Sequence, residues 1–198
     1  MSAAEPSSRR GGLLWRPAGM LLRPGRTLDA VADQHADSIA LYVGYILPLA
    51  AIGPVCGVIG LLVFGASIAG IHLKPSIGAT LIGGVIDYLL SLVSAYLLAL
   101  VVAGLAPLFG ARGGRLQALK LVAYAGTALW LAGLFAVYPT LGFPMAVLGG
   151  LYSLYALFLG LEKVMHAAPD KVLTYFACVL IAVVALAIAL RLATGLIR

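Results

Sequence analysis

The chain has 198 residues, of which 63% are hydrophobic and 10% are charged, and its mean hydropathy is +1.08. Soluble domains carry about 25% charged residues, so this composition excludes a water-soluble globular protein and favours one that is solvated mainly by lipid. The formal net charge is +6, from 13 Lys and Arg against 7 Asp and Glu. Most of these cations flank apolar segments, where Lys and Arg set membrane topology, so no nucleic-acid partner is expected.

The first 37 residues differ in composition from the rest of the chain. Residues 1–26 are rich in Arg, Ser, Pro and Gly, which predicts a flexible basic tail. Residues 27–37 predict a short amphipathic helix with Thr27 as its N-cap and Asp29 in its first turn. Such a helix suits either the membrane surface or a solvated linker, and both alternatives stay open.

Residues 38–198 contain five segments that are long and apolar enough to cross a bilayer, which takes about 20 residues. These predicted spans cover residues 39–68, 77–109, 116–137, 144–162 and 171–194. Pro48 and Pro54 predict a bend or a break in the first span. The second span is long enough to require tilt or protrusion. The predicted fold class is an all-α, polytopic membrane helical bundle.

Lys and Arg counts predict the orientation of these spans, because cytoplasmic loops are enriched in both residues. With the N-terminus in the cytoplasm, ten cations lie on that side and three lie on the other. We therefore expect a cytoplasmic N-terminus and an external C-terminus. Five cations on the cytoplasmic side are candidate contacts for lipid headgroups. They are Arg23, Arg26, Arg112, Arg115 and Lys120.

Two stripes of small residues predict close helix contacts, because small side chains let helices approach in lipid. The first stripe comprises Gly53, Gly57 and Gly60 in the first span, and the second comprises Gly149, Ser153, Ala156 and Gly160 in the fourth. We expect the stripes to join spans within one chain, and contacts between chains remain the alternative.

Asp87 is the acidic residue that lies well inside a predicted span. A charge at that depth costs at least a few kcal/mol, so the carboxyl group should face the bundle interior, be protonated or meet water. Gly84, Asp87, Ser91 and Ser94 share one helical face. Three interpretations remain: a ligand- or proton-binding group, a buried hydrogen bond to another span, and a position near the external interface because the helix protrudes.

The sequence offers little other chemistry. It has no nucleophile–base pair, metal-ligand spacing or phosphate-binding glycine loop in its required context, so we expect neither an enzyme nor a bound metal or cofactor. Cys56 and Cys178 lie inside apolar segments, which is typical of small buried hydrophobic residues.

Several stretches resemble the bacterial branch of the YIP family, a group of membrane proteins that includes Rab-interacting factors. They are YVGYILP at residues 42–48, QALKLVAY at 117–124, WLAG at 130–133, LYSLYALFLGL at 151–161, VM at 164–165 and APDKV at 168–172. The resemblance extends over roughly residues 26–195. It implies five spans with a cytoplasmic N-terminus, and it transfers no catalytic residue.

Two functions are expected from these observations. The first is a non-enzymatic organising, scaffolding or accessory-subunit role in the bacterial inner membrane, with membrane lipids and other membrane proteins, or further copies of the chain, as partners. The second is a small transporter or proton-linked channel that uses Asp87, Ser91 and Ser94. Against the second stand the single acid within the spans and the lack of an obvious internal repeat.

Overall fold

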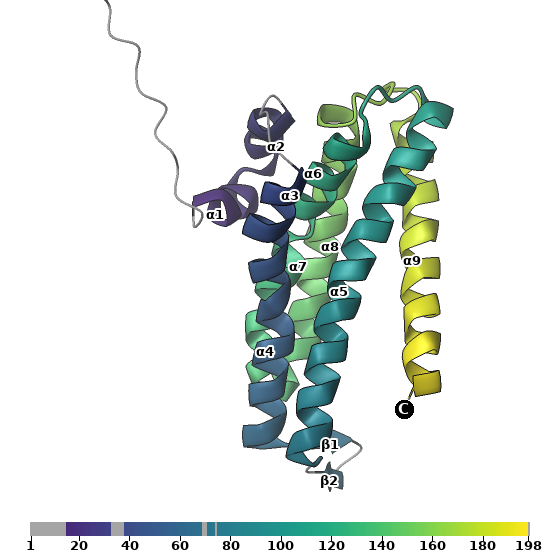
Figure 1. The fold of residues 1–198 in the computed structure, drawn as a ribbon. Helices are drawn as coiled ribbons and strands as arrows, with labels where there is room; N and C mark the ends of the chain where they lie inside the picture. Colours follow the sequence, from purple (N-terminus) through teal and green to yellow (C-terminus); the bar gives the residue numbers. More distant parts are fainter. Residues whose placement is uncertain (1–14, 33–37, 69–70, 74, 198) are drawn as a thin grey trace, which may run out of the picture.

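A computed structural model describes residues 15–32, 38–68, 71–73 and 75–197 of the chain. Its long helices run alongside one another as an elongated bundle (Figure 1). Five helical segments are long and apolar enough to cross a membrane: Ser38–Phe64, Ile77–Phe109, Arg115–Val137, Thr140–Lys163 and Val172–Leu190. The all-α fold class and the five predicted spans are thereby confirmed.

Two short helices precede the first span, α1 (Trp15–Leu22) and α2 (Pro24–Ala32). The sequence predicted a flexible tail up to residue 26 and a helix over 27–37, so helical structure begins earlier than expected. Pro24 is suited to a first helical position because its missing N–H has no intrahelical partner there. Met20 and Leu28 are buried, which gives both helices an apolar anchor. Residues 1–14 and 33–37 lie outside the described residues.

The first span stays helical through both of its prolines. It comprises α3 (Ser38–Leu41), the π-helical turn η1 (Tyr42–Ile46) and α4 (Leu47–Phe64). Pro48 lies two residues after the end of the π turn, which is closed by a hydrogen bond from the Leu47 N–H to the Tyr42 carbonyl. A wider turn accommodates the missing N–H and the ring of a proline. Near Pro48 the predicted bend or break is therefore a local change of helix type, whereas Pro54 lies inside α4 with no change of element.

A short hairpin connects the first two spans. Helix α4 ends at Gly65, whose φ of 71° is readily adopted by glycine. Strands β1 (Ala66–Ile68) and β2 (Ile71–Leu73) then pair antiparallel, which shortens the predicted first span by four residues at its end. The second span comprises α5 (Ile77–Leu105) and the 3-10 turn η2 (Ala106–Phe109).

The third span is divided and the fourth is longer than predicted. The third comprises α6 (Arg115–Ala125), α7 (Thr127–Ala132) and the 3-10 turn η3 (Gly133–Val137), with a change of element at Gly126. Helix α8 (Pro139–Lys163) begins before Pro144, which it includes, and α9 (Val172–Ile197) ends the bundle.

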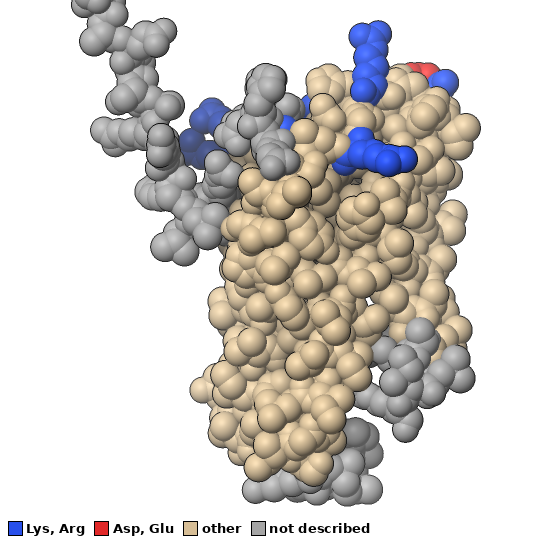
Figure 2. All heavy atoms as spheres, in the orientation of Figure 1, with Lys and Arg blue, Asp and Glu red and all other residues tan. Residues whose placement is uncertain are grey.

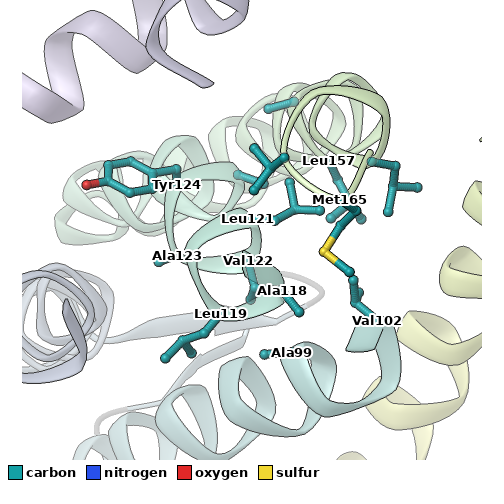
Figure 3. Packing of buried hydrophobic residues seen from close by; sticks show 14 of the residues in the cluster. Ala99, Val102, Ala118, Leu119, Leu121, Val122, Ala123, Tyr124, Leu157 and Met165 are labelled. Carbon is teal, nitrogen blue, oxygen red and sulfur yellow. The ribbon is translucent and has the colours of Figure 1, made fainter. Parts of the chain in front are cut away.

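The third span lies at the centre of the bundle. Half of its most apolar stretch is buried, against 28% or less in each of the other spans. Leu121 and Val122 of α6 belong to one buried cluster with Val102 of α5, Leu157 of α8 and Met165 of the following connection, and Figure 3 shows Met165 between Leu121 and Val102. The core therefore lies near the end of the bundle at which α5 ends and α6 begins.

Candidate functional site

Basic residues cluster at one end of the bundle, where α5 ends and α6 begins. In Figure 2, Lys and Arg side chains stand at this end, and the long middle of the face carries neither cations nor acids. Arg112 and Arg115 are both exposed there. On the orientation predicted from the cation count, this end faces the cytoplasm, where lipid surfaces carry negative charge.

The loop over residues 110–114 is fixed by the connection after α8. The N–H groups of Arg112 and Gly113 both donate to the Met165 carbonyl at 3.0 Å. A Cβ on Gly113 would come within 2.9 Å of the Met165 Cα, so only glycine permits this approach. Gln117 accepts the N–H of Gly114 at 3.2 Å, which closes the start of α6.

Beside this loop lies an open groove of about 540 Å³. Its walls combine the end of α5, η2, the loop and the start of α6, through Leu100, Ala103, Gly104, Ala106, Pro107, Ala111, Gly113, Gly114 and Arg115. Small side chains make the groove: a Cβ on Gly104 would meet no atom within 4 Å. Arg115 is the charged residue among those that line it.

Helix α2 is docked onto the bundle close to the same end. Lys163 of α8 pairs with Asp29, with 2.7 Å between Nζ and Oδ2, and donates to the Gly25 carbonyl at 3.2 Å. Leu28 is fully buried, and its Cδ2 lies 3.5 Å from the place that a Cβ on Gly160 would take. Helix α2 is therefore held on the bundle by contacts with the protein. The sequence predicted either the membrane surface or a solvated linker for this segment, and neither prediction included such contacts.

The five predicted headgroup cations occupy two kinds of environment. Arg23, Arg26, Arg112 and Arg115 are exposed. Lys120 is only 2% exposed, and its ammonium group donates to the Val31 carbonyl at 3.1 Å. This hydrogen bond connects α6 to α2, and the buried Lys120 side chain is therefore not available to lipid headgroups.

The residues of the predicted polar stripe of α5 also occupy two kinds of environment. The Ser91 hydroxyl accepts from Trp130 Nε1 at 3.3 Å, and the Ser94 hydroxyl donates to the Ser91 carbonyl at 2.9 Å. Asp87 lies on the exposed surface of α5, within the second span. Both hydroxyls thus have hydrogen-bond partners inside the chain, while the carboxyl group faces the surroundings of the bundle rather than its interior.

In the first stripe of small residues, two of three glycines face η3. A Cβ on Gly60 would lie 2.6 Å from the Val137 carbonyl oxygen, and a Cβ on Gly133 would lie 2.6 Å from the Gly53 Cα. Gly57 has no such neighbour within 4 Å, so it does not belong to this contact. Gly133 could not be predicted from the sequence, because only its partner Gly53 lies on a recognisable stripe of small residues.

The second stripe faces α7 and α6 along its whole length. A Cβ on Gly149 would lie 2.8 Å from the Ala128 carbonyl oxygen, and the Ser153 hydroxyl accepts the Leu129 N–H at 3.1 Å. Ala156 is fully buried, and Gly160 lies against Leu121. These contacts join spans within one chain.

The described residues bring together no group of three His, Cys, Asp or Glu side chains that suits a metal ion. Cys56 and Cys178 are separate, partly buried thiols.

Four apolar spans packed around a central third span define an integral membrane protein with several spans. The chain belongs to the family of the Yip1 domain, whose model matches residues 18–191. The family predicted from the sequence resemblance is therefore confirmed. Neither the curated proteins nor the solved structures include a match to this chain.

Proposed function

We propose that this Yip1-domain protein is a non-enzymatic organiser or accessory subunit of the bacterial inner membrane, with its N-terminus in the cytoplasm. The observation that carries the proposal is Asp87, an acidic side chain exposed on a membrane-spanning helix. Its helix also exposes Ile82, Val85 and Leu89, which suit hydrocarbon. A carboxyl group beside them needs a hydrogen-bond donor that hydrocarbon does not supply.

The length of the second span supports the same conclusion. Its 33 residues extend about 50 Å, against about 30 Å of hydrocarbon. If the bilayer is centred on the span, about 10 Å of helix extends beyond hydrocarbon at each end, and Asp87, about 15 Å along the helix from Ile77, lies in hydrocarbon. If Asp87 lies at the external boundary, the exposed apolar residues Ile77 and Leu81 extend into water. A partner protein with a polar group beside an apolar face satisfies α5 in either position.

A small transporter or proton-linked channel is the alternative, since a carboxyl group within a span is also what proton coupling needs. The hydroxyls expected to continue a polar path from Asp87 are those of Ser91 and Ser94, and both are engaged in hydrogen bonds within the chain. This arrangement favours an intermolecular contact at Asp87 over a relay along α5.

The test is gentle extraction of the full chain from its native membranes, followed by mass spectrometry of the intact complexes. Wild type is compared with Asp87→Leu and with Leu89→Ala, a control on the same exposed helix. We expect a stoichiometric protein partner, or a second copy, that Asp87→Leu loses and Leu89→Ala keeps.

A partner that survives Asp87→Leu would refute the role of this carboxyl group. A wild-type chain that stays alone and, in proteoliposomes, drives a flux abolished by Asp87→Asn would establish the transporter instead.

A further inference from the structure

The groove beside the loop over residues 110–114 joins two kinds of surface. One wall belongs to the apolar second span, through Leu100, Ala103 and Gly104, and the opposite rim belongs to the polar loop and the start of α6. If the end of the second span lies at the membrane surface, the groove crosses the boundary between the hydrocarbon and the headgroup layer. A ligand that fits both parts has an apolar tail and a polar head.

The charge of the rim determines which kind of polar head such a ligand would have. Arg115 lines the groove, and the exposed Arg112, which is not itself a lining residue, lies in the loop between the lining residues Ala111 and Gly113. No lining residue is acidic. A guanidinium group can form strong, paired hydrogen bonds with phosphate oxygens, and the loop and the start of α6 each expose one.

The rim is rigid as well as basic. The Met165 carbonyl holds two successive N–H groups of the loop, and the side chain of Gln117 holds a third. A rim fixed in this way does not have to be ordered when a ligand binds, which lowers the entropic cost of binding.

We propose that this groove binds one anionic phospholipid, with its phosphate beside Arg112 and Arg115 and an acyl chain along Leu100, Ala103 and Gly104. The apolar wall distinguishes this ligand from free phosphate, which would use the loop alone. The inference does not rest on the function proposed above, because the residues of the groove lie toward the other end of α5 from Asp87.

The test uses the purified full chain in detergent, titrated with dioleoylphosphatidylglycerol or dioleoylphosphatidylcholine and followed by native mass spectrometry. Three proteins are compared with wild type: Arg112→Gln/Arg115→Gln, which removes the charge, Gly104→Leu, which fills the groove, and Gly78→Leu as the control. Gly78 lies near the other end of α5, and its Cβ would also meet no atom within 4 Å. All three are expected to fold, because the changed positions are exposed.

Wild type should bind one phosphatidylglycerol in preference to phosphatidylcholine. Each arginine near a membrane surface contributes about fivefold to the attraction of anionic lipid, so the double arginine variant should lose roughly 25-fold in affinity for phosphatidylglycerol and little for phosphatidylcholine. Gly104→Leu should lose the bound lipid while Gly78→Leu retains it.

Equal affinity for the two lipids in wild type, or equal binding by Gly104→Leu and Gly78→Leu, would overturn the proposal. Displacement of the lipid by millimolar inorganic phosphate, with no effect of Gly104→Leu, would show a site for the headgroup anion alone and would also overturn it.

Discussion

Gly149 provides the sharpest test of the packing. In Gly149→Ala, the new methyl group would lie 2.6 Å from the Ala132 Cβ, 2.8 Å from the Ala128 carbonyl oxygen and 3.2 Å from the Leu129 Cα. Two of these atoms belong to the backbone of α7, which moves only if the two helices separate. Overpacking of this kind costs about 1–3 kcal/mol.

The neighbouring Gly150 is the matched control, since a Cβ there meets no atom within 4 Å. Both substitutions replace glycine in the interior of α8, so both gain up to about 1 kcal/mol of helix propensity. The gain cancels when the two variants are compared. Their stabilities should therefore differ by about 1–3 kcal/mol, with Gly149→Ala the less stable.

The comparison is made by thermal unfolding of the purified variants in one detergent, with helical circular dichroism as the signal. For a chain of this length the expected difference is roughly 2–12 °C in Tm. Equal midpoints for the two variants would refute the close contact between α8 and α7. A higher midpoint for Gly149→Ala would do so more strongly.

The same reasoning predicts that Gly60→Ala destabilises the protein by about 1–3 kcal/mol while Gly57→Ala does not, because only Gly60 lies against the carbonyl groups of η3. The two Tm values, measured side by side, check this, and equal values would contradict the contact. Lys163→Gln should cost at most about 1 kcal/mol, because its partner Asp29 is more than half exposed and solvent screens the pair. Its loss of stability should shrink at high salt, and a loss that salt leaves unchanged would show that packing, not charge, is what Lys163 contributes.

The sequence was sufficient for the fold class because long apolar runs separated by charged or Gly- and Pro-containing connections specify membrane helices almost without tertiary information. The interruptions within spans were not predictable. Gly126 divides the third span, yet isolated glycines elsewhere in the bundle, such as Gly104 in α5, leave their helix continuous. Whether a glycine ends a helix depends on what packs around it, and hydropathy carries no information about that.

The candidate sites show the same limit. Small-residue spacing indicated which face of α8 packs, because the helical period alone fixes that face. Helical spacing did not predict whether a given cation is buried or exposed. Lys120 and Arg115 lie five residues apart in one basic stretch, yet Lys120 is buried against α2 and Arg115 is exposed at the groove. The tie between Lys163 and Asp29 crosses 134 residues of chain, which no local pattern reveals.

The two proposals meet on one helix and constrain each other. Asp87 precedes Pro107, which lines the groove, by 20 residues, or about 30 Å of helix. This length equals the thickness of the hydrocarbon layer. A phospholipid bound in the groove would hold that end of α5 at the level of the headgroups, and Asp87 would then lie at the opposite boundary. The residues that precede it, including Ile77, Leu81 and Ile82, would extend beyond hydrocarbon with their apolar side chains exposed. Lipid anchoring at one end would thus move the need for a protein partner from the Asp87 carboxyl group to the exposed apolar residues that precede it.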